Sequence, residues 1–193
     1  EEREAIINTC RKMCDLTYFI GTWGNVSVRR GNHILLTPSR VDYETMKPED
    51  IVVIDMRGNK IAGNRNATSE KEVHRQIYLV RDDIQAIIHA HTANAMAVSA
   101  MAEKEVPCLV EEMSQLLGGS IPITDGYIAA GQHFELGRMA GATIGNKNAL
   151  ILRNHGPVAC GKDLEEAVLA AKVVEKACGI YLNTLRAGTV PTP

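Results

Sequence analysis

The apolar residues of the chain follow two patterns, one typical of helices and one typical of strands. Near the start, Ile6, Cys10 and Met13 recur every three or four positions and predict an amphipathic helix over residues 2–19. The same period predicts further helices over residues 69–81, 92–101 and 135–144 and a long last helix capped by Asp163. The helices therefore occupy both ends and the middle of the chain.

Shorter apolar runs between these helices predict strands over residues 26–29, 33–36, 51–54, 84–91, 149–152 and 157–160. Arg30-Gly31-Asn32 reads as a hairpin turn, so the first two strands are expected to be antiparallel neighbours. Residues 86–88 are continuously apolar, which places their strand in the middle of a sheet. Early hairpins do not fit a regular alternating parallel fold, and we expect a largely antiparallel sheet covered by helices.

Length and charge narrow the picture further. The 193 residues are enough for one well-buried domain, which we expect to span 1–193. The formal net charge is −2, and no block of Lys or Arg stands out. This excludes nucleic acid or an acidic membrane surface as the main partner. A small anionic ligand remains possible, because backbone amides and hydroxyls bind phosphate without a basic patch.

The five cysteines are odd in number and widely spaced, and Cys10 and Cys14 are interpreted as small core residues. No signal peptide is recognisable, and no apolar run is long enough to span a bilayer. A reducing cytoplasm is therefore the expected location. The chain begins without Met and stops at Pro193, so we expect both ends to be trimmed.

Histidines at one predicted strand end suggest a metal site. His89 and His91 lie two positions apart, which puts both side chains on one face of a strand. Such a pair alone is more often a surface or core pair than a metal site. His155, in the turn between two later strands, offers a third nitrogen, and three nitrogens with one exchangeable position is the usual plan of catalytic zinc. His33 and His133 are interpreted as surface or structural residues.

Polar residues open the helix before this strand. Ser69 and Glu72 have the spacing of a capping box, and exposed amides and hydroxyls at a helix start favour an anion such as phosphate. Glu70, in the first turn, is a candidate to face the metal. His74 lies one turn later on the same helix and is a candidate to support a ligand.

Five separated motifs together resemble the class II aldolase/adducin family, and most closely its L-fuculose-1-phosphate aldolases. In chain order these motifs are Gly24-Asn25-Val26-Ser27-Val28-Arg29, Thr37-Pro38-Ser39, Thr68-Ser69-Glu70, His89-Ala90-His91 and Asn154-His155-Gly156. The resemblance covers nearly the whole chain. It implies an α/β fold of three αβα layers with a mainly antiparallel central sheet, and a homotetramer with active sites at the subunit interfaces.

The resemblance also assigns roles to residues. It implies one Zn²⁺ per subunit held by His89, His91 and His155, with Glu70 as fourth ligand in the empty site and as acid/base during turnover. Manganese or cobalt are open alternatives to zinc, because imidazole-rich sites bind several such metals. The phosphate and substrate pocket of the family corresponds here to Thr22, Gly24, Asn25, Ser39, Arg40, Thr68 and Ser69.

A tyrosine of the neighbouring subunit handles the proton at the aldehyde oxygen in these aldolases, and Tyr127 matches it with a one-residue insertion. Two positions depart from the family pattern. Arg40 stands where the aldolases usually have Gly, so it either strains the backbone or adds a charged contact to phosphate or carboxylate. Trp23 stands where a small residue is usual and is expected to narrow the pocket.

The resulting hypothesis is a retro-aldol cleavage of a ketose 1-phosphate, such as L-fuculose 1-phosphate, to dihydroxyacetone phosphate and a short aldehyde. Three related enzymes remain as alternatives. Pentulose-5-phosphate 4-epimerases typically carry Asp at the position of Glu70, methylthioribulose-1-phosphate dehydratases usually lack this acid, and Arg40 keeps sugar-acid aldolases and decarboxylases open. A non-catalytic adducin-like interaction module is the alternative of another class, but such domains tend to lose the ligands.

Overall fold

The computed structural model describes residues 1–189 and 192, and its centre is a single large sheet. Among the described residues, seven strands form this sheet, and every pair of neighbours is antiparallel. Across the sheet the strands are β4 (Lys60–Ala62), β3 (Val52–Asp55), β2 (His33–Leu36), β1 (Asn25–Arg30), β5 (Ala86–His89), β9 (Gly156–Gly161) and β8 (Ala149–Leu152). The expected antiparallel sheet with β5 near its middle is confirmed.

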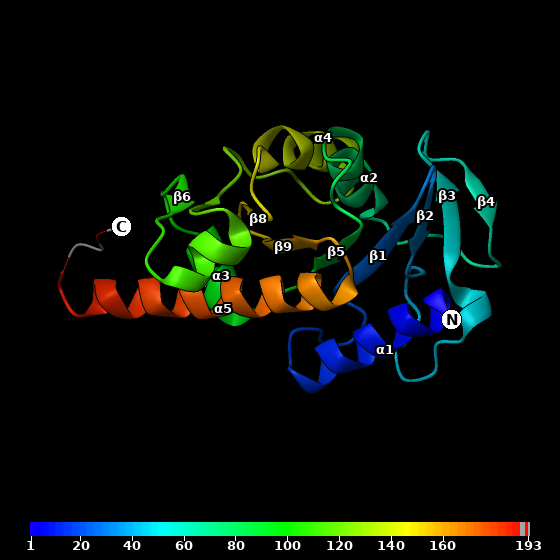
Figure 1. Ribbon diagram of the computed structural model, residues 1–193, viewed down its shortest axis with the longest axis horizontal. Helices are drawn as coiled ribbons and strands as arrows, with labels where there is room; N and C mark the ends of the chain where they lie inside the picture. Colours follow the sequence, from blue (N-terminus) through cyan, green and yellow to red (C-terminus); the bar gives the residue numbers. More distant parts are fainter. Residues whose placement is uncertain (190–191, 193) are drawn as a thin grey trace.

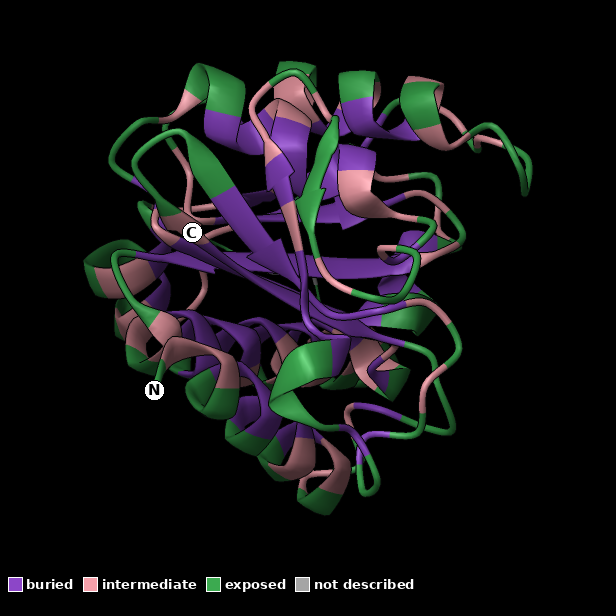
Figure 2. Ribbon diagram, turned by 90° about the vertical axis from the view of Figure 1, so that its right-hand side faces the viewer, coloured by how far each residue is buried: buried purple, intermediate pink, exposed green. Residues whose placement is uncertain are grey.

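Helices cover both faces of the sheet and make three layers (Figure 1). One face is covered by α1 (Glu2–Asp15), by α5 (Leu164–Arg186) and by α3 (Ala93–Ser99), which packs against α5. The other face carries α2 (Lys71–Val80) and α4 (His133–Ile144). The expected αβα architecture is therefore confirmed, and Figure 2 shows the buried sheet between the helical layers.

The smaller elements lie in the connections. These are the 3₁₀ turn η1 (Pro48–Asp50), the π-helical turn η2 (Met113–Leu117) and a separate two-stranded sheet of β6 (Glu105–Val106) and β7 (Ile121–Pro122). Both η2 and β7 fall within residues 108–127, where the sequence shows neither a helical nor a strand period. The edge strand β4 was not predicted, because all three of its residues are exposed and show no apolar alternation.

Strand β1 shows how alternation builds the layers. Val26 and Val28 point to the face of α1 and α5, where they join an apolar cluster with Ile88 of β5. Asn25 and Ser27, at the alternate positions, point to the face of α2 and α4. Both are buried, so this face holds polar side chains inside the protein rather than in solvent. The interior on this side therefore contains polar groups that can bond to other buried side chains.

Most helix boundaries lie within two residues of the prediction, and the end of α1 differs most. Helix α1 ends at Asp15 rather than at Phe19, because Thr17 adopts a left-handed backbone with φ of 59° and the amides of Tyr18 and Phe19 bond back to the Met13 carbonyl. The chain then turns toward β1. This turn brings Phe19 into the core, where its ring packs against the backbone of Gly24.

Helix α2 begins at Lys71, and the expected capping box of Ser69 and Glu72 is wrong. The Glu72 carboxylate is instead held by Arg75 at 2.8 Å, close to the turn at Gly58, so it does not reach back to the helix start. Thr68, rather than Ser69, bonds a backbone amide at the start of the helix: its hydroxyl accepts from the Glu70 amide at 3.3 Å. The Glu70 side chain makes no capping bond at the start of α2.

Candidate metal and substrate site

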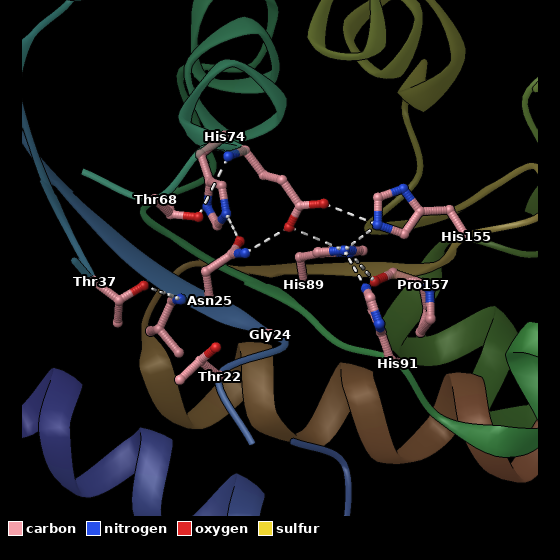
Figure 3. A network of polar contacts seen from close by, with 12 residues as sticks. Thr22, Gly24, Asn25, Thr37, Thr68, His74, His89, His91, His155 and Pro157 are labelled. Atoms are coloured by element: carbon pink, nitrogen blue, oxygen red, sulfur yellow. Dashed lines mark hydrogen bonds and ion pairs between the residues drawn. The ribbon is translucent and has the colours of Figure 1, made fainter. Parts of the chain in front are cut away.

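Four side chains from three parts of the chain meet beside the end of β5. They are Glu70, His89, His91 and His155, and one donor atom from each lies within 4.8 Å of the others. His89 ends β5 and is fully buried, His91 follows two residues later, and His155 lies in the turn between β8 and β9. Figure 3 shows the three imidazoles turned toward a common centre. The structure therefore brings together the whole predicted ligand set.

The contacts within this cluster involve the same ring atom of each histidine. The Nε2 atom of His89 lies 3.2 Å from Nε2 of His155 and 3.2 Å from Nε2 of His91. The Glu70 carboxylate completes the group, with Oε1 2.8 Å from Nε2 of His155 and Oε2 3.4 Å from Nε2 of His89. Donors at such separations surround one point from several sides.

The orientation of His89 fits a metal ion. Its Nδ1 atom lies 2.9 Å from the carbonyl oxygen of Pro157, which only accepts, so Nδ1 carries the proton and Nε2 presents its lone pair to the cluster. Converging imidazole lone pairs beside a carboxylate repel one another unless a cation lies between them. Three nitrogens and one exchangeable carboxylate make a donor set suited to a divalent metal such as zinc.

The pKa shifts of Glu70 and His91 agree with this interpretation. Burial raises the pKa of Glu70, but the neighbouring His89 and His155 outweigh burial and bring the pKa well below its ordinary value. Burial, together with His89, lowers the pKa of His91 to about 4. Burial also lowers the pKa of His89, but Glu70 more than reverses this and leaves the pKa raised. An ionised carboxylate and a neutral His91 are the forms that bind metal.

A cavity of about 440 Å³ opens beside the cluster. Glu70, His91 and His155 lie in its wall, so any metal held here faces the cavity. All seven residues that the family resemblance assigned to substrate binding also line it, namely Thr22, Gly24, Asn25, Ser39, Arg40, Thr68 and Ser69. The site thus combines a metal centre with a polar chamber large enough for a small sugar phosphate.

Two of the loops that line the cavity are tied together by their backbones. The Thr68 amide donates to the Thr37 carbonyl at 3.0 Å, and the Ser39 amide donates to the Asn66 carbonyl at 2.9 Å. The Thr37 amide donates in turn to the Val26 carbonyl at 3.1 Å, which joins these loops to β1. Hydroxyl groups from segments distant in the sequence are therefore held on one wall.

The loop before β1, which contains Thr22 and Gly24, packs closely against the ring of Phe19. The φ of Gly24 is +116°, and a Cβ at this position would lie 2.3 Å from the Phe19 ring. The buried Tyr43 hydroxyl holds the same loop by donating to the carbonyls of Gly24 and, at 3.3 Å, of Thr22. Sequence reasoning did not single out Tyr43, because a lone tyrosine in a turn-rich stretch carries no signal of its partner.

Arg40 and Trp23 both lie on the cavity wall. Arg40 adopts a left-handed backbone with φ of 58°, a conformation that suits glycine and strains a residue with a side chain. Among the described residues that line the cavity, it is the one Lys or Arg. Trp23 is 65% exposed at the cavity mouth.

Tyr127 also lines the cavity and is 60% exposed. Here Tyr127 lines the cavity of its own chain, and its role in the active site of a neighbouring subunit stays a prediction. The adjacent segment Ile128–His133 contributes further wall residues that sequence reasoning missed, including Gln132 and His133. His133 was expected to be structural or on the surface. Its spacing from the other histidines gave no hint, because only the packing of α4 brings it to the cavity.

Three further findings bear on the other predictions. His33 is exposed at the start of β2, as expected of a surface residue. All five cysteines are free, with Cys10 fully buried and Cys14 half-buried. In the part of the chain that the structure describes, no helix combines the length and the apolar character needed to cross a bilayer.

Comparison with known proteins places the chain in a family. The model of the class II aldolase and adducin N-terminal domain matches residues 4–182. An L-fuculose phosphate aldolase from Methanocaldococcus jannaschii is 36% identical over 188 residues, covering 95% of this chain and 97% of that protein. The L-fuculose phosphate aldolase of Escherichia coli is also 36% identical over 188 residues, covering 97% of this chain and 85% of that enzyme.

The fold agrees with these relatives. A solved structure of an L-fuculose 1-phosphate aldolase superposes with a TM-score of 0.92 at 32% identity, covering 99% of this chain and 90% of the other. A putative aldolase/epimerase/decarboxylase from Klebsiella pneumoniae superposes with a TM-score of 0.85 at 24% identity, over 94% of this chain and 88% of that one, which speaks for the fold alone. With its fold, its motifs and its complete Glu-His₃ cluster, the chain belongs to the class II aldolase/adducin family.

Proposed function

We propose that this chain is a zinc-dependent aldolase that cleaves a ketose 1-phosphate, L-fuculose 1-phosphate or a close analogue, to dihydroxyacetone phosphate and a short aldehyde. The observation that carries the proposal is the complete cluster of Glu70 and three histidines in the wall of a polar cavity. The likeness to L-fuculose phosphate aldolases over almost the whole chain supports the choice of substrate class.

The metal is proposed to be held by the Nε2 atoms of His89, His91 and His155. A bound divalent cation supplies Lewis acidity, which draws electron density from a substrate carbonyl and makes the neighbouring carbon–carbon bond easier to break. Zinc is favoured because imidazole-rich sites with four donors suit it. Manganese and cobalt are alternatives, because such sites also bind these metals.

Glu70 is proposed to move the proton at the carbon next to the carbonyl. Its Oε2 atom accepts from Nδ2 of Asn25 at 2.7 Å, while Oε1 faces His155, so the carboxylate is held at the cavity wall. An ionised carboxylate at this place accepts a proton and returns it on the same face. Tyr127 is proposed to take the proton of the hydroxyl group that becomes the aldehyde oxygen, in the active site of a neighbouring subunit, while the carbon next to the carbonyl gains a proton through Glu70.

The substrate phosphate is proposed to bind at the tied loops. Hydroxyl groups of Thr22, Ser39, Thr68 and Ser69 and the amide of Asn25 offer donors on one wall, and Arg40 adds a permanent positive charge. Multiple short donors with one guanidinium are a common way to bind a phosphate dianion without a large basic patch. This arrangement explains how a chain of slightly negative net charge recognises an anion.

A homotetramer in the cytoplasm is proposed as the working form, with residues 1–193 acting as one domain of each subunit. Large apolar side chains are exposed at and near the cavity, including Ile20 at 59%, Trp23 at 65% and Phe134 at 59%. Large exposed apolar side chains of this kind favour a subunit interface there. Five free thiols suit a reducing compartment.

Two experiments test the proposal. Metal analysis of the purified protein is expected to find about one zinc per chain, and a protein with no metal affinity supports the adducin-like alternative instead. Aldehyde release is then measured over a matched panel of ketose 1-phosphates and pentulose 5-phosphates. Cleavage confined to the ketose 1-phosphates supports the aldolase, and epimerisation of the 5-phosphates without aldehyde release contradicts it.

A further inference from the structure

A line of buried polar side chains leads from the core to Glu70. The Tyr78 hydroxyl lies 2.8 Å from the Ser27 hydroxyl, which lies 2.7 Å from Nδ1 of His74. The Nε2 atom of His74 contacts Oδ1 of Asn25, and Nδ2 of Asn25 lies 2.7 Å from Oε2 of Glu70. We call Tyr78, Ser27, His74 and Asn25 the buried polar chain. Figure 3 shows its last steps, where His74 points to Asn25.

With a neutral His74 ring, only one arrangement of protons satisfies every contact. The Glu70 carboxylate only accepts, so the NH₂ of Asn25 faces Glu70 and its oxygen faces His74. An amide oxygen also only accepts, so Nε2 of His74 carries the proton. Nδ1 of His74 then accepts from Ser27, whose oxygen accepts from the hydroxyl of Tyr78. The direction of each bond is therefore set by its neighbour.

The backbone explains how these groups line up. His74 and Tyr78 lie one helical turn apart on α2, so their side chains emerge on the same face of the helix. Asn25 and Ser27 alternate along β1 and point to that face of the helix. The two side chains of α2 therefore meet the two side chains of β1 between the helix and the sheet. The exposed fraction is at most 2% for each of the four residues, so no solvent competes for these bonds.

We propose that His74 is a positioning residue that acts through Asn25, fixing its amide so that the NH₂ group holds the Glu70 carboxylate toward the histidine cluster. The inference rests on the proposed role of Glu70 as metal ligand and acid/base. His74 does not contact the cavity, since it is fully buried and absent from its wall. Its effect on the reaction therefore has to pass through Asn25.

The charge state of His74 supports this role. Burial, with the neighbouring His89, lowers the pKa of His74 to about 3, so the ring stays neutral at ordinary pH. A neutral ring with one Nε2 proton gives a fixed donor to Asn25. The amide of Asn25 cannot pass a proton onward, so the buried polar chain orients Glu70 and does not conduct protons to it.

A purely structural role for His74 makes different predictions. In that case His74 fills space between α2 and β1, and its replacement lowers stability without changing the folded protein's metal affinity or turnover. Val73 supplies the matched control, because it precedes His74 on α2 and is fully buried, but packs only in the apolar cluster. The variant Val73→Ala destabilises the same helix without touching the polar chain.

The test compares His74→Phe, His74→Gln and Val73→Ala as full-length protein. Readouts are zinc affinity from competition with a chromophoric chelator, kcat and KM for the ketose 1-phosphate, and the thermal unfolding midpoint. His74→Phe keeps the ring but loses both bonds, and we expect zinc affinity and kcat to fall about 10–100-fold with little change in KM. His74→Gln restores a donor near Asn25 and is expected to recover most of the loss.

A double-variant cycle tests the route through Asn25. In an Asn25→Ala background, His74→Phe is expected to add no further loss of zinc affinity or kcat, because the amide through which His74 acts on Glu70 is already absent. Full additivity overturns the inference. So does a His74→Phe protein whose zinc affinity and kcat match those of Val73→Ala at equal loss of stability.

If His74→Phe does not fold, Ser27→Ala replaces it. This variant removes the donor to Nδ1 of His74 and is expected to weaken zinc binding more than Val73→Ala, and equal zinc affinity in the two proteins contradicts the inference. Glu70→Gln separates the two proposals. Full activity and zinc affinity in Glu70→Gln sink the proposed role of Glu70, whereas loss there with intact His74→Phe sinks only the inference about His74.

Discussion

Asn25 of β1 and His89 of β5 lie directly opposite each other in the antiparallel register of the sheet. Residues paired in this way point to the same face, so the sheet itself brings a buried amide and a buried imidazole side by side. The carboxylate of Glu70 lies against both, with its Oε2 atom 2.7 Å from Nδ2 of Asn25 and 3.4 Å from Nε2 of His89. One oxygen atom is thus shared between a positioning group and the metal cluster.

Replacing Glu70 by Gln is expected to lower kcat about 10²–10⁴-fold, the usual contribution of a general acid/base. The amide keeps the size of the side chain but cannot accept a proton in turnover. Steady-state kinetics with saturating zinc, together with a thermal unfolding curve, provide the check. A variant with zinc bound and full turnover contradicts the assigned role.

Removing the metal is expected to abolish activity and to lower the unfolding midpoint. A ligand present at about 100 times its dissociation constant stabilises the folded state by about 2.7 kcal/mol, and chelation removes this contribution. Calorimetry with and without chelator measures the shift. In His89→Ala, which lacks the central ligand, we expect chelator to leave the midpoint almost unchanged. An equal shift in both proteins places the metal elsewhere.

Arg40→Gly is expected to raise KM for the phosphorylated substrate about tenfold or more, because a hydrogen bond to a charged group contributes about 1.5–3 kcal/mol. Stability is expected to change by less than about 1 kcal/mol, since relief of the left-handed backbone offsets the greater freedom of the unfolded chain. Kinetics and denaturant unfolding measure the two effects. Arg138→Ala, at an exposed position of α4, is the control for loss of surface charge.

Gly24→Ala is expected to destabilise the protein by about 2–4 kcal/mol, from overpacking against Phe19 together with an unfavourable backbone angle. Gly21→Ala separates these causes. Gly21 also has a positive φ of +61°, but no atom lies within 4 Å of its Cβ position, so only the backbone cost of about 1–2 kcal/mol is expected. Equal losses in urea unfolding for both variants contradict the steric argument.

The buried His74 gives the metal-free protein a specific dependence on pH. Its pKa is about 3 in the folded state and near 6.5 when unfolded, so below about pH 6.5 the unfolded chain binds the extra proton. This contribution makes stability fall as the pH is lowered below about 6.5, by about 1.4 kcal/mol per unit, until the pH approaches 3. The variant His74→Gln lacks the imidazole that binds this proton. Its free energy of unfolding is expected to fall less steeply than that of the wild type between pH 6 and pH 4.

Local patterns were enough to predict most elements. The spacing of Ile6, Cys10 and Met13 and the alternation after Asn25 correspond to α1 and β1, because helical and strand periods are written in neighbouring residues. The ligand set was also predictable, since His89 and His91 share a strand end and the family motifs supply His155 and Glu70. Boundaries were less predictable. The end of α1 depends on the left-handed Thr17, and the start of α2 depends on where Glu72 finds Arg75.

The sequence by itself determined which chemical groups this protein carries: three imidazoles, one carboxylate and loops rich in hydroxyls. Only the tertiary structure decided how they are aimed. The pairing of β1 with β5 puts Asn25 beside His89, and the packing of α2 on that face lets His74 set the amide of Asn25 against Glu70. Periodicity reports neighbours along the chain, whereas hydrogen-bond direction depends on partners that only strand register and helix packing bring together.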